Sequence, residues 1–262
     1  MKNKKHLVIE ASPRDGYCLD FATRYMELLD KREHEVKLLR IKNLGIKPCS
    51  GCNLCLRKGE EYCPFYKDAC ADVIKAMEEA DFITYFVPNF SLQVPGGLKT
   101  LFDRLAYVFH RPRMFGKCSS SFVVQGVYGG AKIVSYLREV MDAWGSNVVR
   151  GAVLKGGLKR SDISPSTCNT DRIMVKTIQQ MEKKLLSNPY RIPTMFKLMI
   201  FRMTRSFMKF SEEATPVDRQ YFQDQGWSDS EYFYPVRLSL FKKVLGKLFD
   251  KMAIKMCKKK SV

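Results

Sequence analysis

The stretch that decides the fold is residues 6–29, which read HLVIEASPRDGYCLDFATRYMELL. Its apolar start, residues 6–11, is typical of a β-strand, and the Ser-Pro-Arg-Asp-Gly segment that follows is typical of a loop. Apolar residues then recur at helical spacing, at Leu19, Phe21, Ala22, Tyr25, Met26 and Leu29. The opening of the chain therefore predicts a strand, a loop and a helix.

Four further strands are expected at residues 36–41, 82–87, 120–124 and 148–153, with helices between them over residues 72–79 and 133–144. The segment 82–87 is apolar enough to be buried on both faces, as a central parallel strand requires. The alternation predicts a doubly wound α/β fold with a five-stranded parallel sheet. Ligands of such sheets bind at the carboxyl ends of the strands, so function is expected in the loops after strands one, three and four.

The composition is that of a globular protein. The chain has 262 residues, of which 45% are apolar and 12% aromatic, enough for a sizeable core. Its longest strongly apolar stretch, residues 82–87, is too short to cross a bilayer, and Glu10 and Pro13 interrupt the first apolar run before it reaches the length of a signal peptide. We therefore expect a cytoplasmic protein. The net charge of +18 favours anionic partners but carries no information about the fold.

Beyond residue 156 the pattern changes to helices without strands, over residues 171–186, 194–210 and 237–257. We expect a domain over residues 1–156, with a cysteine loop at residues 48–70, and a basic, aromatic-rich helical extension over residues 157–262. In the last helix an apolar stripe recurs at three- and four-residue steps, at Phe241, Val244, Leu245, Leu248, Met252 and Met256. Lysines occupy the rest of its surface.

A basic amphipathic helix of this kind either packs on protein or lies on an anionic membrane. We expect packing on the protein's own domain or on a second subunit, because residues 221–234 supply aromatic surface for the helices to cover. A homo-oligomer, a dimer or larger, is also expected. Peripheral membrane contact is the alternative.

The loop after the first strand leads into the N-terminus of a helix, where unpaired N–H groups and the helix dipole favour an anion. Ser12 and Arg14 add side-chain donors that suit a phosphate. The same residues also suit an ordinary strand-to-helix turn. The second loop begins with Pro88-Asn89-Phe90 and continues through Pro95-Gly96-Gly97, and the third is Gln125-Gly126-Val127-Tyr128-Gly129-Gly130, whose glycines let the backbone approach a flat ligand closely.

In this order the three loops resemble those of the flavodoxin-like NAD(P)H-dependent FMN reductase family, over roughly residues 5–155. The carrying motifs are Ser12-Pro13-Arg14, Pro88-Asn89-Phe90, then Pro95 through Leu98-Lys99 to Phe102-Asp103-Arg104, and Gly126 with Gly129-Gly130. The resemblance implies a flavodoxin-like fold and bound FMN. It assigns the flavin to Ser12, Arg14, Gly16, Tyr17, Cys18, Pro88, Asn89, Phe90, Ser91, Leu92, Gln125, Gly126, Tyr128, Gly129 and Gly130. Departures from the family pattern are Phe90 for Tyr, Cys18 for Ser or Thr, and Glu10-Ala11 where glycine is common.

Five of the nine cysteines lie within residues 49–70. Cys49, Cys52 and Cys55 are two residues apart and Cys63 follows after seven more, a compact run that suits a cuboidal iron-sulfur cluster. Zinc is less natural, since no second Cys-x2-Cys pair or nearby His is present. The run resembles that of the iron-sulfur flavoproteins, a branch of the same family that carries a four-iron four-sulfur cluster beside FMN. Reduced structural thiols are the other interpretation, and Cys70 is expected at a helix start rather than as a ligand.

We therefore expect an FMN-dependent oxidoreductase that takes electrons from NAD(P)H or a protein donor and passes them to a small-molecule or protein acceptor. No side-chain acid or base is required for hydride transfer, so no catalytic residue is assigned. Two alternatives are a cluster-free quinone, nitro or azo reductase and, in another class, a basic zinc-containing nucleic-acid module. The chain has no known nucleic-acid motif, and no nucleic-acid partner is expected. Arg104 and Lys132 are interpreted as helix-surface charges, and the dispersed His6, His34 and His110 suggest no metal site.

Overall fold

The computed structural model describes residues 4–156 and 168–260. The chain forms two compact units. Unit 1 holds Met1–Gly51 and Phe65–Pro189, and unit 2 holds Cys52–Pro64 and Tyr190–Val262.

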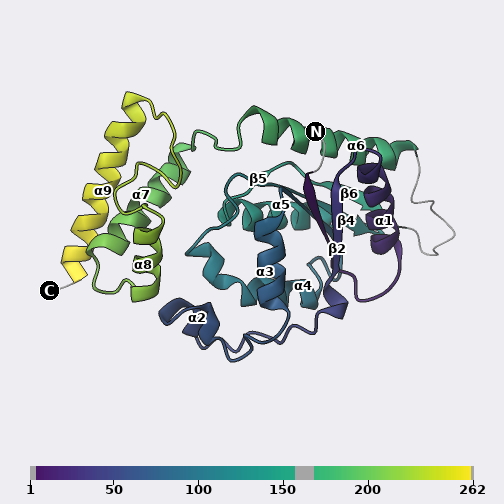
Figure 1. Ribbon diagram of the computed structural model, residues 1–262, viewed down its shortest axis with the longest axis horizontal. Coiled ribbons are helices and arrows are strands. Elements are labelled where there is room, and N and C mark those ends of the chain that lie inside the picture. The colour runs from purple at the N-terminus through teal and green to yellow at the C-terminus, as the bar shows by residue number, and fades with distance from the viewer. Residues whose placement is uncertain (1–3, 157–167, 261–262) are drawn as a thin grey trace. The chain divides into compact units, whose positions relative to one another are not determined.

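Unit 1 is built on a parallel sheet (Figure 1). Its strands are β1 (Lys5–Glu10), β2 (Glu35–Arg40), β3 (Phe82–Pro88), β4 (Cys118–Gln125), β5 (Asn147–Val148) and β6 (Ala152–Lys155). The order is β2-β1-β3-β4, with β5 and β6 both paired to β4 at the last position. This is the 2-1-3-4-5 order of flavodoxin-like sheets, so the predicted fold class is confirmed.

The burial pattern explains the order of the strands. All seven residues of β3 are buried, as a strand covered on both faces must be. The single strand expected at residues 148–153 is divided into β5 and β6. Between them Gly151 approaches β4 so closely that a Cβ would lie 2.2 Å from the Ser121 carbonyl oxygen.

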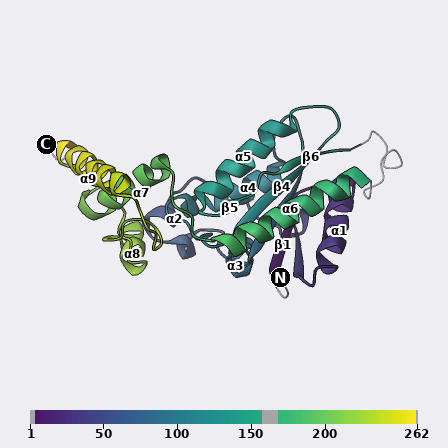
Figure 2. The ribbon, with the colours of Figure 1, turned by 90° about the horizontal axis from the view of Figure 1, so that it is seen from above.

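Helices cover both faces of the sheet. α1 (Tyr17–Asp30) and α6 (Cys168–Ser187) share one face, where Phe21, Tyr25, Met174 and Ile178 join Phe86 in one core. On the opposite face lie α3 (Cys70–Glu79), α4 (Gly96–Arg104) and α5 (Gly130–Ala143) (Figure 2). Two short 3-10 turns, η1 (Ile41–Asn43) and η3 (Ala106–Phe109), complete this unit.

The first unit extends past residue 156, where the sequence suggested a boundary. Met174 and Ile178 of α6 are buried in the core beneath α1. Ion pairs fasten the same helix to α1 and its C-terminal turn, from Arg24 to Asp171 at 2.5 Å and from Arg32 to Glu182 at 3.0 Å. α6 therefore belongs to the sheet unit, and the compact units divide at Pro189.

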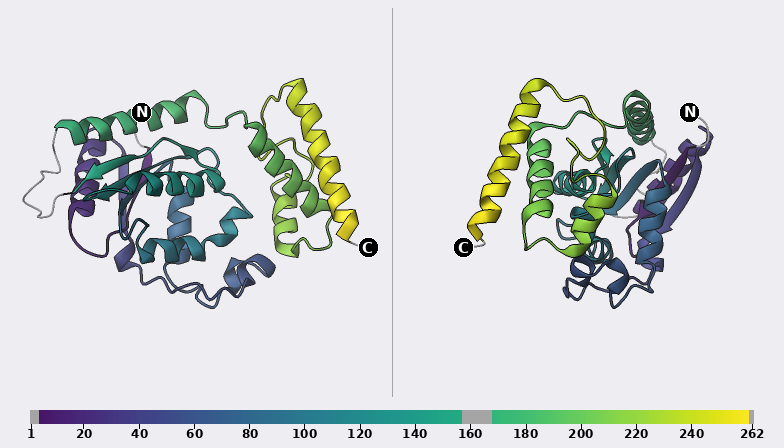
Figure 3. Two further views of the ribbon diagram at one scale, coloured as in Figure 1. Left: turned by 180° about the vertical axis from the view of Figure 1, so that it is seen from behind. Right: turned by 60° about the vertical axis from the view of Figure 1, so that its left-hand side comes forward.

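Unit 2 is helical. It contains α7 (Met195–Phe210), α8 (Pro216–Asp224) and α9 (Leu240–Lys260), together with α2 (Leu54–Arg57) and the turn η2 (Glu60–Tyr62) (Figure 3). Its core is aromatic: Phe201 of α7 contacts Tyr232 and Phe233 with ring centroids 5.3 and 4.5 Å apart, and Trp227 contacts Phe222 at 5.1 Å. The aromatic segment is thus covered by helices, as expected.

The face of α9 that packs on α7 is not the apolar stripe. Asp250 receives hydrogen bonds from Arg202 (3.0 Å) and Ser206 (3.1 Å) and an ion pair from Arg205 (2.7 Å). Gly246 lies against Arg202, and Ala253 is buried. Within unit 2, a small residue and a carboxylate make the close contact of α9 with α7, and Leu245 of the stripe is half-buried. Packing of the stripe on unit 1 or on a second subunit stays a prediction.

Candidate functional site

Three loops lie at one edge of the sheet in unit 1. β1, β3 and β4 are adjacent and parallel, so the loops after Glu10, Pro88 and Gln125 all leave the sheet at its carboxyl edge. The structure therefore brings together the three segments that the sequence singled out. This edge is the position at which doubly wound sheets bind ligands.

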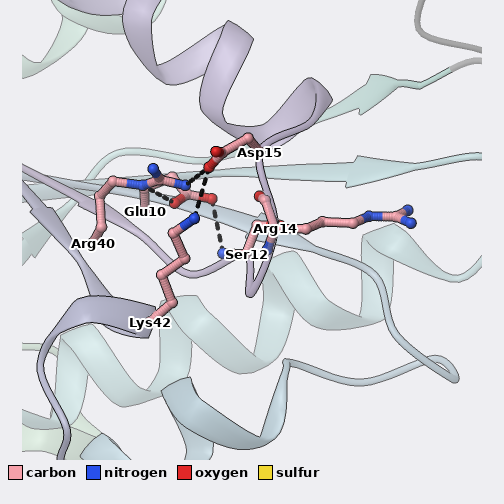
Figure 4. Close-up of polar contacts among 6 residues, drawn as sticks. All are labelled: Glu10, Ser12, Arg14, Asp15, Arg40 and Lys42. Atoms are coloured by element: carbon pink, nitrogen blue, oxygen red, sulfur yellow. Dashed lines mark hydrogen bonds and ion pairs between the residues drawn. The ribbon is translucent and has the colours of Figure 1, made fainter.

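The loop after β1 rests on a charged network (Figure 4). The Glu10 side chain is fully buried, and its carboxylate accepts hydrogen bonds from the Ser12 N–H at 2.8 Å and from Arg40 Nε at 3.0 Å. Arg40 also donates a hydrogen bond to Asp15 Oδ1 at 2.6 Å, and Lys42 Nζ donates to the same oxygen at 2.8 Å. The hydrogen bonds from Lys42 and Arg40 lower the pKa of Asp15 to about 2. The loop is thus held to the ends of β1 and β2 by paired charges.

The predicted phosphate residues surround the start of α1. The Ser12 hydroxyl is buried and donates to the Arg14 carbonyl oxygen at 2.9 Å. The side chain of Arg14 is exposed and extends away from the charged network (Figure 4). Gly16 is the N-cap residue, provides no side-chain cap, and has open space where a Cβ would lie. The start of α1 therefore has no side-chain cap at Gly16, and a helix N-terminus of this kind favours an anion.

Cys18 is buried at this helix start. Burial and the neighbouring Glu10 carboxylate raise the pKa of the Cys18 thiol well above its usual value. The thiol therefore stays neutral and adds no negative charge beside the anion site.

The loop after β3 is a tight hairpin. Phe90 and Gln93 exchange backbone hydrogen bonds of 3.0 and 2.9 Å, and the two residues between them, Ser91 and Leu92, both have positive φ, at 50° and 64°. This is the backbone of a two-residue type I′ turn. The turn leaves Phe90 and Leu92 exposed at its tip, while Pro88 stays buried as the last residue of β3.

The loops after β3 and β4 are joined. Asn89 Nδ2 donates to the Tyr128 carbonyl oxygen at 2.7 Å, and its backbone N–H donates to Val124 at 2.8 Å. Gly129 has a φ of 95°, and a Cβ there would lie 2.5 Å from Leu92 Cδ2. Gln125 accepts a hydrogen bond from the Gly130 N–H at 2.6 Å and so holds the start of α5. The loops after β3 and β4 are therefore in direct contact and form one surface.

This surface carries features that suit a flat, partly polar ligand. Asn89 Oδ1 is buried and has no hydrogen-bond partner among the residues that the structure describes. Gly126 has open space around it, and the side chains of Val127 and Tyr128 are exposed beside those of Phe90 and Leu92. An unpaired acceptor, an accessible backbone and apolar side chains together fit the isoalloxazine ring.

The cysteine loop is fastened at its base by Arg104. The Arg104 guanidinium donates to the carbonyl oxygens of Lys47 and Phe65, both at 2.9 Å, and pairs with Asp68 at 2.5 Å. Asp68 in turn accepts from the N–H groups of Lys47 and Cys70, each at 3.0 Å. Burial alone would raise the pKa of Asp68, but these donors hold it below its usual value. Arg104 is buried, so its interpretation as a helix-surface charge is wrong.

Of the four predicted cluster ligands, Cys49 is exposed and Cys52, Cys55 and Cys63 are half-buried. Cys49 lies in unit 1 and accepts from the Gly51 N–H at 3.4 Å. In unit 2, Cys52 and Cys55 flank and enter α2, and Cys63 follows η2. Among the described residues no three His, Cys, Asp or Glu side chains are placed to hold a metal ion. The thiols are chemically suited to iron, but they do not form a ligand set as they lie. Cys70 begins α3, as expected.

The network around Glu10 and the Arg104–Asp68 pair were not identified from the sequence as parts of the site. Arg40 and Lys42 do follow the strand that neighbours β1, and this position at the carboxyl edge is the signal that could have found them. In the sequence, Glu10 stands out only as a departure from the family pattern.

Comparisons with known proteins give one family and several relatives. The sequence model of a family described as NADPH-dependent FMN reductase matches residues 5–157. An iron-sulfur flavoprotein of Archaeoglobus fulgidus is 32% identical over 143 residues, which are 54% of this chain and 64% of that protein. A second iron-sulfur flavoprotein of this organism is 26% identical over 192 residues, covering 70% of this chain and 94% of the relative.

A solved structure of RosB with a bound formylriboflavin phosphate intermediate is similar in fold over 90% of this chain and 92% of that protein. Its TM-score is 0.57 at 10% sequence identity.

Proposed function

The chain belongs to the NADPH-dependent FMN reductase family and is an FMN-dependent NAD(P)H oxidoreductase, and from this premise we propose that the loops after β1, β3 and β4 hold its FMN. The observation that carries the proposal is the meeting of these three loops at one edge of the sheet, with an uncapped helix start in the first and accessible backbone in the other two.

At the phosphate end, the chain offers backbone donors. The backbone N–H groups of Gly16, Tyr17 and Cys18 would bind the phosphate, supported by the dipole of α1. The Ser12 hydroxyl, which donates to the Arg14 carbonyl oxygen, would have to turn from it to donate to the phosphate. Arg14 is free to turn its exposed side chain toward the phosphate. The Cys18 thiol is neutral and Asp15 is paired with Arg40 and Lys42, so neither residue adds an unpaired negative charge beside the phosphate.

At the ring end, residues 88–92 and 125–130 would position the flavin. Asn89 Oδ1 is an unpaired acceptor for a ring N–H, and Phe90, Leu92 and Tyr128 supply apolar surface. Bound FMN would supply the hydride- and electron-transfer chemistry. The chain would bind the ring, fix its orientation through the Asn89–Tyr128 link and limit its contact with water. NAD(P)H or a protein donor would supply the electrons, and a small molecule or protein would accept them.

Titration of apoprotein with FMN tests the phosphate assignment. Arg14→Ala should weaken FMN binding by about tenfold to a hundredfold, since a hydrogen bond to a charged group contributes roughly 1.5–3 kcal/mol. Arg138→Ala, at an exposed arginine of α5, is the matched control and should bind FMN as the unmodified protein does. Equal FMN affinities of the two variants would show that Arg14 does not bind the phosphate.

We also propose that Cys49, Cys52, Cys55 and Cys63 are ligands of a four-iron four-sulfur cluster. Support comes from their spacing, the partial exposure of their side chains and the names of the two relatives. The loop would have to rearrange to gather them, and Arg104 fixes its two ends while its middle adapts.

Iron analysis after anaerobic reconstitution separates this proposal from a cluster-free quinone, nitro or azo reductase. About four irons per chain are expected, lost in Cys52→Ser and kept in Cys257→Ser, with FMN retained in both. An iron content near zero in the unmodified protein would exclude the cluster and favour the cluster-free reductase. Either result is consistent with a flavoprotein. The family assignment favours a flavoprotein over the basic zinc-containing module.

A homo-oligomer and a cytoplasmic location remain parts of this proposal. The exposed Phe90, Leu92, Val127 and Tyr128 form a surface that a second subunit would cover beside the flavin. Sedimentation velocity of the FMN-loaded protein, with Val127→Asp as the interface variant, tests the oligomer.

A further inference from the structure

The stripe of α9 is exposed along the whole helix. We define the α9 stripe as Phe241, Val244, Leu248, Met252 and Met256, whose exposed fractions lie between 48% and 68%. These residues are three or four positions apart and so occupy one face. The opposite face, with Gly246, Asp250 and Ala253, packs on α7. The stripe is therefore surface that α9 does not use to hold unit 2 together.

Lysines border the stripe. Lys247, Lys251, Lys255 and Lys258 are exposed along the same helix and make no ion pair within residues 4–156 and 168–260. The one acidic residue of α9, Asp250, is turned inward and is engaged by Arg202 and Arg205. The outer face of α9 thus combines large apolar side chains with uncompensated positive charge.

α7 extends the apolar surface. Its exposed Phe196, Ile200 and Phe210 lie on one face of the helix with Met203 and Phe207. Met203 and Phe207 line a groove of about 250 Å³ between α7 and α9, together with Thr204, Ala253, Met256 and Cys257. Met256 belongs to both the groove and the α9 stripe, so the two apolar areas are continuous.

Charge decides which partner fits this surface. A second copy of the chain would bring its own lysines against Lys247, Lys251 and Lys255, and the chain carries a net charge of +18. An anionic lipid bilayer offers what the surface lacks, since its headgroups pair with lysines while its acyl region receives Phe, Leu and Met side chains. None of the described helices is long and apolar enough to span a membrane, so the contact would be at the interface.

We propose that the outer face of α7 and α9 binds peripherally to anionic membranes. The α9 stripe enters the boundary between headgroups and acyl chains, and the lysines contact the headgroup phosphates.

Co-sedimentation of the full-length protein with phosphatidylglycerol vesicles, compared with phosphatidylcholine vesicles, tests this proposal. We expect pelleting with the anionic vesicles only, weakened as salt rises. Val244→Asp/Leu248→Asp should reduce partitioning at least tenfold. Leu186→Asp, at an exposed leucine of α6, is the matched apolar control and should not.

The charge contribution is tested separately. Lys247→Glu/Lys251→Glu/Lys255→Glu should also reduce partitioning at least tenfold. Lys37→Glu/Lys67→Glu/Lys75→Glu makes the same change in net charge on exposed residues of unit 1 and should have a smaller effect. Circular dichroism melting curves confirm that each variant is folded.

Equal pelleting with neutral vesicles, or equal losses in test and control variants, would overturn the proposal. So would a lipid-independent dimer that Val244→Asp/Leu248→Asp dissociates, which would assign the face to a second copy. Binding to duplex DNA in place of vesicles, with the same sensitivity to the lysine variants, would also overturn it.

Discussion

Gly129 is the residue at which the joined loops have least room for a side chain. Its φ of 95° disfavours any other residue, and a Cβ would meet Leu92 at 2.5 Å. Gly129→Ala should therefore lower the free energy of unfolding of the apoprotein by about 1–3 kcal/mol. Thermal denaturation followed by circular dichroism measures the change.

Gly126→Ala is the matched comparison in the same loop. Gly126 has open space and no positive φ, so the stability of the apoprotein should not change. FMN affinity should fall nonetheless, because the new methyl group would stand where the backbone approaches the ring. A Gly126→Ala protein that binds FMN normally would contradict the position of the ring against this loop.

Arg40 compensates a buried carboxylate. Glu10 is fully buried, and Arg40→Met would leave its charge without its ion-pair partner. Removal of one partner of a buried pair costs about 3–5 kcal/mol, so urea unfolding should show a loss approaching this range. The double variant Glu10→Gln/Arg40→Met should recover much of it, since no buried charge is left. No recovery would show that Arg40 acts through Asp15 instead.

At the scale of elements, the cysteine loop depends on α4. Arg104→Met should loosen residues 48–64, because it removes the donors that hold Lys47, Phe65 and Asp68. Hydrogen exchange by mass spectrometry should show faster exchange in this segment. Lys99→Met breaks only an exposed pair with Asp103 on the same helix and serves as the control.

The same pair predicts a pH effect. Because the pKa of Asp68 is lowered in the folded protein, its contribution to stability is present above the unfolded pKa of about 4 and is lost as pH falls below it. In Arg104→Met this acid sensitivity should be smaller. An unchanged acid limb in the pH dependence of unfolding would argue against the pairing.

At the scale of the whole molecule, His6 joins β1 to the elements around it. His6 Nε2 lies 2.8 Å from Thr84 Oγ1 on β3 and 3.5 Å from the Tyr25 hydroxyl on α1, and its ring centroid is 6.3 Å from that of His34. Burial, followed by the nearby His34, lowers the pKa of His6 to about 3. Residues that are distant in sequence thus form one buried polar group in the core.

The lowered pKa of His6 makes the stability of the protein depend on pH. Below about pH 6.5 the unfolded chain takes up a proton at His6 that the folded chain does not, so stability falls by about 1.4 kcal/mol per pH unit. His6→Gln keeps hydrogen-bonding capacity without titration and should show a shallower slope between pH 6.5 and 5. Chemical denaturation at a series of pH values measures both slopes; equal slopes would mean that His6 is protonated in the folded protein.

The sequence by itself determined the sheet, the order of its loops and the family. Apolar segments such as residues 82–87 and the glycine and proline motifs are local signals, because strand burial and turn geometry depend on neighbouring residues. The sequence therefore predicts the positions of the three loops without information on which strands are neighbours in the sheet. Their meeting at one edge follows from parallel strands in adjacent positions.

Only the tertiary structure decided which charges are buried and which helix faces pack. Glu10 pairs with Arg40, and Asp68 pairs with Arg104. The partners are more than 25 residues apart in the sequence, so the periodicity of a single helix or strand does not predict these ion pairs. α6 belongs to the sheet unit because Met174 and Ile178 are buried in one core with Phe21 and Tyr25 of α1. α9 packs on α7 through Gly246 and Asp250, because two helices approach closely where the side chains are small or form ion pairs. Hydrophobic periodicity in the sequence identifies only the larger apolar side chains of α9, and most of these are exposed.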